Sequence, residues 1–289
     1  MLIRLGYDIQ FDVTGEVPIV TLLNVHPSRE QDLREADVFS ADPPVAIEHY
    51  RDTFGNHSCR LLAPAGRIRL QNSTLIEDSG LPDPESPDAA EIPVDRLPTD
   101  VLPFLLNSRY CEVDLLSSVA AELFWNAPRG WGRVKAVCEW VHSKVKFGYE
   151  FSSPFRTAVG VYTERVGVCR DFQHLAITFC RALNIPARYA TGYLGDIGIP
   201  PVPGPMDFSA WFEVYLGGRW WTFDARHNAR RIGRVLLATG RDATDCAITT
   251  SFGTTRLAWF QVVSDQVVSE EVQGPPASLA HSKGIIVGA

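Results

Sequence analysis

The sequence predicts an α+β protein, in which helices pack on an antiparallel sheet and an all-β, sandwich-like part comes first. Up to about residue 77 the chain consists of short, alternating runs of β-favouring residues separated by turn signals. Beyond about residue 113, apolar residues recur at helical spacing, and from residue 187 strand-like runs return. These two changes of pattern predict the fold class.

The N-terminal part is expected to be all-β. Residues 2–13 and 67–77 alternate polar and apolar side chains, and shorter apolar runs occupy 19–25, 45–50 and 58–62. Turn signals such as Pro43-Pro44 and Gly55-Asn56 separate these runs. Several short strands with no helical period are typical of a β-sandwich.

One stretch has the composition of a linker. Residues 82–100 are rich in proline and acidic residues. We therefore expect a β-sandwich-like domain over residues 1–100 that ends in this linker, and a second domain over 101–289. The small, polar tail from 274 to 289 is expected to lie outside regular structure.

The second domain is expected to begin with helices and end with strands. Helical spacing predicts helices over 113–125, over 131–146 and from Cys169 to about Leu183. Strand-like runs follow at 187–194, 210–216, 220–224 and 235–238, with more β-like sequence to about residue 268. Gly217-Gly218 between two of these runs predicts a two-residue hairpin.

Composition excludes several classes of protein. The 289 residues carry a formal net charge of −7, so the chain lacks the net positive charge that would attract nucleic acid or an anionic membrane. The six cysteines show no metal-ligand spacing, and their dispersal is typical of reduced thiols in a cytosol. Because no signal peptide, long apolar run, phosphate loop or dinucleotide fingerprint is visible, we expect a cytoplasmic protein with no metal or organic cofactor. Nothing in the sequence indicates its oligomeric state.

The segment Gly167-Val168-Cys169-Arg170-Asp171-Phe172 carries the first chemical signal. It begins a helix whose apolar positions recur on one side, so Cys169 is expected in the first turn. Unpaired backbone N–H groups and the helix dipole favour a thiolate there, and a thiolate can attack a carbonyl. The alternative is that Cys169 is a small buried apolar residue, as most free cysteines are.

Thiol acyl chemistry also needs a base and an acceptor that orients the base. Asp224 ends the aromatic strand-like run 220–224 and is the candidate acceptor. The alternative is that it is a strand-end or turn residue, which is the commoner role of a lone aspartate.

Two ordered segments resemble a known family. GVCRDFQHLAITFCRALNIPARYATGYL and MDFSAWFEVYLGGRWWTFDARHN resemble the core motifs of the bacterial transglutaminase-like superfamily, in a branch labelled as cysteine proteases with an added N-terminal β domain. The resemblance covers about residues 130–230. It implies a papain-like core and a Cys, His, Asp triad in that chain order, in which the cysteine corresponds to Cys169 and the aspartate to Asp224.

The middle member of that triad is replaced. The family motif places histidine directly before Ala-Trp, and this chain has Ser209 there. A serine hydroxyl is not basic enough near neutral pH to take the thiol proton. Three interpretations follow. Ser209 is an inactivating substitution; or the enzyme works through helix-end activation of Cys169 or with a base from elsewhere; or the site binds a ligand without cleaving it.

Other histidines offer weak substitutes. His227 lies three residues after Asp224 and is expected to be a loop residue that holds backbone, with replacement of the base as its alternative role. His174, five residues after Cys169, is expected to be a buried core residue. His142 is expected to make a surface or interhelix contact.

We therefore predict a thiol enzyme that acts on a peptide or protein amide through a Cys169 thioester, with weak or absent turnover because of Ser209. By resemblance, hydrolysis as a peptidase or amidase is favoured over acyl transfer to an amine. The alternative is an inactive module of the same fold that binds a peptide or an acyl group. Two experiments distinguish the enzyme from the binding module: the pH dependence of Cys169 alkylation, and thioester formation by a Ser209→His variant.

Overall fold

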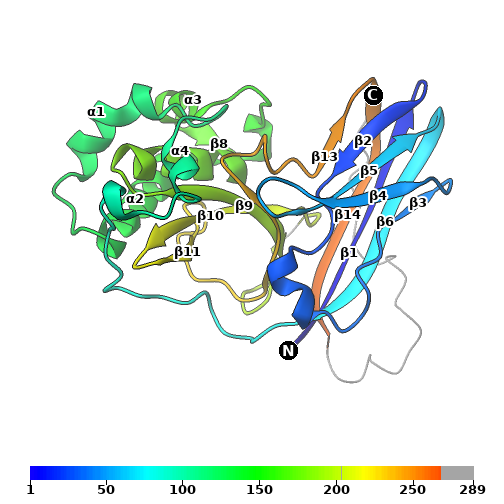
Figure 1. The fold of residues 1–289 in the computed structure, drawn as a ribbon, viewed down its shortest axis with the longest axis horizontal. Helices are drawn as coiled ribbons and strands as arrows, with labels where there is room; N and C mark the ends of the chain where they lie inside the picture. Colours follow the sequence, from blue (N-terminus) through cyan, green and yellow to red (C-terminus); the bar gives the residue numbers. More distant parts are fainter. Residues whose placement is uncertain (203, 268–289) are drawn as a thin grey trace.

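The computed structural model describes residues 1–202 and 204–267. Figure 1 shows helices gathered at one end, a twisted sheet beside them, and long strands of a β-sandwich at the other end. This arrangement confirms the predicted α+β class with a strand-rich N-terminal region. The predicted tail at 274–289 lies outside the described residues.

The β-sandwich consists of two four-stranded antiparallel sheets with the strand orders β14-β1-β6-β3 and β13-β2-β5-β4. Side chains that alternate along these strands, among them Ile3, Leu5, Ile19, Leu61 and Ile68, are buried between the two sheets. The strands are β1 (Leu2–Val13), β2 (Val17–Thr21), β3 (Ser40–Asp42), β4 (Ile47–Arg51), β5 (His57–Ala63), β6 (Gly66–Glu77), β13 (Thr249–Ser251) and β14 (Thr255–Val267).

Two of these strands come from the end of the described chain. β14 pairs along the whole length of β1, and β13 pairs with β2. Residues 249–267 thus belong with the N-terminal strands, which corrects the expectation that 101–289 all form the second domain. The β-like sequence before residue 268 could not reveal this, because a strand pattern does not identify its partner.

The second domain is built on another antiparallel sheet, in the order β11-β10-β9-β12. Its strands are β9 (Ala187–Leu194), β10 (Ser209–Leu216), β11 (Arg219–Phe223) and β12 (Arg234–Gly240). The predicted hairpin joins β10 to β11 at Gly217 and Gly218, whose φ angles are 59° and 89°. Both values fit the left-handed backbone that a tight hairpin turn needs.

Four helices cover one face of this sheet (Figure 1): α1 (Val113–Phe124), α2 (Trp131–Lys144), α3 (Ala158–Glu164) and α4 (Cys169–Ala182). Every residue of α4 from Asp171 to Arg181 is buried, so α4 is the central helix, with the other three and the sheet packed around it. The short parallel strands β7 (Lys146–Phe147) and β8 (Val166–Gly167) lead into α4.

The opposite face of the second sheet packs on the sandwich. Tyr193, Phe208, Val235 and Leu237 belong to the same buried cluster as the interior of the sandwich. The loop that precedes β10 is therefore held where the two parts meet. No helix in residues 1–202 and 204–267 is long and apolar enough to cross a bilayer.

Candidate active site

Cys169 is the first residue of α4. Val168 before it is extended, and its N–H donates to Asp171 Oδ2 at 3.0 Å, which fixes the start of the helix. All six cysteines lie in the described part of the chain, and only Cys169 is incompletely buried. Helix position and partial exposure both suit a reactive thiol.

The electrostatic environment nevertheless favours the neutral thiol. Burial raises the pKa of Cys169 to about 11, and the nearby Asp207 carboxyl adds to this rise. Arg226 and backbone N–H groups of Ala210 and Arg170 act in the opposite direction but do not offset it. The helix start favours a thiolate, whereas burial acts in the opposite direction and favours the neutral thiol.

Asp224 directly follows β11, and its carboxylate accepts a dense set of hydrogen bonds. Oδ1 accepts from Gln173 Nε2 at 3.1 Å and from the backbone N–H groups of Arg226 and His227 at 3.0 Å. Oδ2 lies 2.7 Å from His227 Nδ1 and accepts from Arg234 at 2.9 Å. The carboxylate is therefore held by side chains from several segments as well as by its own turn.

Asp224 is ionised despite its burial. Burial acts to raise its pKa, but the Arg234 charge and the bonds from His227 outweigh this effect and hold the pKa far below its usual range. A buried, ionised carboxylate is what the orienting member of a catalytic triad requires. The imidazole that it holds here belongs to His227.

Ser209 begins β10 and pairs with Gly192 of β9. Its hydroxyl oxygen is buried and has no hydrogen-bond partner within the described residues. Gln173 Nε2 donates to the carbonyl of the next residue, Ala210, at 3.2 Å as well as to Asp224. Gln173 thus connects the Asp224 carboxylate with the strand position where the family histidine would stand.

Two pockets meet at Cys169, and both are also lined by Asp207, Phe208 and Ser209. The first has a volume of about 730 Å³ and is mostly apolar, with walls that include Tyr189, Leu257 and Phe260. The second has a volume of about 390 Å³ and includes the charged side chains of Asp196, Arg226 and Arg231 together with His227. The structure therefore brings Cys169 and Ser209 to one opening, and Gln173 links Ala210, the residue after Ser209, to Asp224.

Sequence reasoning missed several of these residues. Gln173 lies four residues after Cys169, so helical spacing puts the two on the same side of α4, and this signal was available. Arg234 and Asp207 gave no comparable signal, because their roles depend on burial. His227 was expected to be a plain loop residue, and its contact with Asp224 was not foreseen.

The other histidines match their expected roles more closely. His174 is buried, accepts a hydrogen bond from the Ala243 N–H at 3.1 Å and stacks on Tyr110. Burial lowers its pKa to about 3. His142 contacts the carbonyl of Arg226 at 2.7 Å, so it supports the loop after Asp224.

Comparison with known proteins identifies the family. The family model described as "Transglutaminase-like superfamily" matches residues 117–225, a range that contains Cys169, Ser209 and Asp224. The crystal structure of a "putative cysteine protease" from Cytophaga hutchinsonii is 31% identical, covers 92% of this chain and 90% of that one, and has a TM-score of 0.79. The chain belongs to the transglutaminase-like superfamily.

Two further matches are weaker. The uncharacterized protein ML0607 of Mycobacterium leprae is 29% identical over 117 residues, which is 39% of this chain and 42% of that relative's own length. The crystal structure of the periplasmic domain of TgpA from Pseudomonas aeruginosa is 12% identical, covers 78% of this chain and 88% of that one, and has a TM-score of 0.39. The cytoplasmic location expected for this chain stays a prediction.

Proposed function

We propose that this protein is a thiol acyl enzyme that acts on peptide amides through a thioester at Cys169, and that Ser209 makes its turnover slow. The observation that carries the proposal is the junction of the two pockets. Cys169 and Ser209 line both of them, and Gln173 ties the adjacent strand to the buried Asp224 carboxylate. These contacts support a triad framework that lacks its usual base.

The two pockets suit the two sides of a peptide bond. The apolar pocket can hold an acyl-side segment, and the charged pocket can hold the amine-side segment. Cys169 Sγ would attack the carbonyl carbon between them, and the amine would leave with a proton as the thioester forms. Backbone N–H groups of Ala210 and Arg170, which act on Sγ, are the candidate donors to the oxyanion.

The slow turnover follows from two features. A thiol with a pKa of about 11 is almost entirely protonated near neutral pH. Ser209 cannot take up its proton, so attack depends on a small thiolate population. In triad enzymes, loss of a member leaves only the rate enhancement that binding and the oxyanion donors supply, which is about 10³–10⁴ over water.

The name of the similar Cytophaga protein favours peptide hydrolysis over amine crosslinking. The test is the variant Ser209→His, assayed with an activated peptide ester and a peptide amide. The imidazole should restore a burst of acyl-enzyme, detectable by mass spectrometry, and should raise kcat by at least about 100-fold. Adding Cys169→Ala must abolish the burst, and adding Asp224→Asn should reduce it.

The raised thiol pKa favours a second candidate, an inactive module that binds a peptide or acyl group in the apolar pocket. If Ser209→His folds but forms no acyl-enzyme, while the chain and its Cys169→Ala variant bind a peptide equally well, this candidate replaces the enzyme. A matched Ser209→Gln variant shows whether any gain comes from basicity or from side-chain size.

A further inference from the structure

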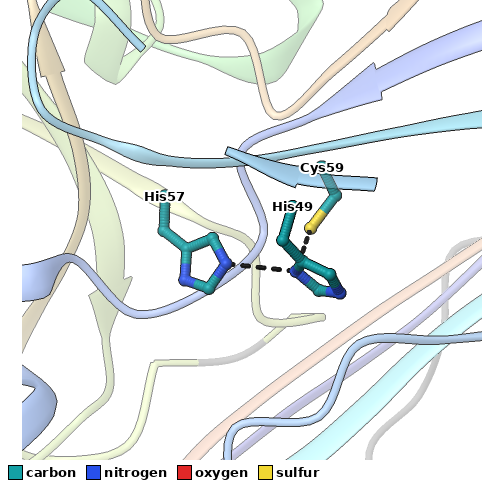
Figure 2. A group of neighbouring side chains, drawn as sticks. All are labelled: His49, His57 and Cys59. Carbon is teal, nitrogen blue, oxygen red and sulfur yellow. Dashed lines mark hydrogen bonds between the residues drawn. The ribbon is translucent and has the colours of Figure 1, made fainter. Parts of the chain in front are cut away.

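A second group of chemically active side chains lies in the β-sandwich, on the adjacent strands β4 and β5. In the register of this pair, His49 stands opposite Cys59. His57 precedes Cys59 by two residues on β5, so its side chain lies on the same face of the sheet. Figure 2 shows the two imidazoles and the thiol converging on the same side of the strands.

The donor atoms lie close together. His49 Nδ1 is 3.1 Å from His57 Nε2 and 3.2 Å from Cys59 Sγ, and all three atoms are within 4.8 Å of one another. Tetrahedral zinc, with bonds of about 2.0 Å to nitrogen and 2.3 Å to sulfur, separates adjacent donors by about 3.3–3.5 Å. The two distances from His49 Nδ1, 3.1 Å to His57 Nε2 and 3.2 Å to Cys59 Sγ, are close to those separations.

Hydrogen bonding does not account for both close contacts of His49 Nδ1 at once. A neutral ring nitrogen offers either one hydrogen or one lone pair, yet His49 Nδ1 faces two partners. The thiol hydrogen of Cys59 also has another acceptor, Asn24 Oδ1, at 3.2 Å. A cation that accepts one lone pair from each of the three donors would satisfy all of them together.

The surroundings allow a cation to enter and to remain bound. Cys59 is fully buried on the inner face of the sandwich, whereas His49 is exposed and His57 is partly exposed. A metal would therefore reach the thiol from solvent past the imidazoles. Arg51, which is paired with His57 in the strand register, has its charge balanced by an ion pair with Glu30 at 2.5 Å.

We propose that His49, His57 and Cys59 form a binding site for a divalent zinc-class cation, with water in the fourth position. Two imidazoles and one thiolate are donors that zinc accepts, while magnesium and calcium prefer oxygen. On binding, the Cys59 S–H bond breaks, its proton goes to solvent, and the sulfur lone pair forms the metal bond. The ion would join the edge strand β4 to β5.

The test uses the full chain after chelator treatment, titrated with Zn²⁺ in a calorimeter. We expect one Zn²⁺ per chain, bound with proton release, and a higher Tm with Zn²⁺ than with chelator. His49→Gln and Cys59→Ser should each weaken binding by at least about tenfold. His49→Gln is the safer variant, because that side chain is exposed, and its circular dichroism should match that of the parent.

Cobalt substitution identifies the donor atoms. Co²⁺ should give a thiolate charge-transfer band that Cys59→Ser abolishes. The matched control is Cys169→Ala, which removes the most accessible thiol elsewhere and should leave both the band and the stoichiometry unchanged. The proposal fails if Zn²⁺ does not bind, if His49→Gln binds it as tightly as the parent, or if the band follows Cys169.

Discussion

The pH dependence of Cys169 alkylation can be worked out from the site. Burial raises the pKa of this thiol to about 11 from its ordinary 9.0. The thiolate fraction at pH 7 is then roughly one in ten thousand, about a hundredfold below that of an ordinary thiol. A more basic thiolate is also more nucleophilic, by about eightfold over two pKa units. The net rate at pH 7 should therefore be about tenfold below that of an ordinary cysteine.

The assay is iodoacetamide labelling of the native chain between about pH 6 and pH 11, with mass spectrometry of each cysteine-containing peptide. The other five cysteines are fully buried, so Cys169 should dominate the labelling. Its rate should rise about tenfold per pH unit up to about pH 10. A short peptide with the same flanking residues is the control. A plateau below pH 9, or a neutral rate equal to that of the peptide, would refute the reasoning.

Three further predictions concern stability, each measured by denaturant unfolding. Asp224→Asn removes the charge that pairs with buried Arg234 and should lower the free energy of unfolding by about 3 kcal/mol. This is the lower end of the range for a broken buried ion pair, because Asp83 still pairs with the same guanidinium. A cost below about 1 kcal/mol would contradict this reasoning. Gly192→Ala places a Cβ against the backbone carbonyl oxygen of Val235, closer than real Cβ atoms approach, and should cost at least about 1–3 kcal/mol, so an unchanged unfolding midpoint would count against the packing described. Burial lowers the pKa of His174 to about 3, so this side chain stays neutral in the folded chain. Below pH 6.5 the unfolded chain therefore binds more protons, and the free energy of unfolding should decrease by up to about 1.4 kcal/mol for each unit by which the pH is lowered. His174→Gln should flatten this slope, and an equal slope would exclude His174 as its cause.

Much of the fold could be predicted from periodicity. The long helices and most strands lie within a few residues of their expected positions, because burial of one face imposes a regular pattern. The seven-residue α3 was not predicted, since it is too short to establish a period. The pairing of β14 with β1 also could not be read from the sequence, because it joins segments from opposite ends of the described chain.

The candidate site was predictable where local sequence determines position. The start of α4 places Cys169, the register of β10 with β9 places Ser209, and Asp224 directly follows β11. The effect of burial on the thiol pKa could not be predicted, because a helix end is visible in the sequence and desolvation is not. The convergence of His49 with His57 and Cys59 was missed for a similar reason. It depends on the register between β4 and β5, and a search for CxxC-like spacing does not test register.

The pairing of β14 with β1 has a consequence for synthesis in the cell. During translation, β1 leaves the ribosome long before the strand that will cover its edge. At about 5–20 residues per second, that delay is on the order of tens of seconds. Throughout it, β1 presents an unpaired edge of the kind that recruits other nascent chains. We expect production of this protein to depend on chaperones, and fragments that stop before residue 249 to aggregate.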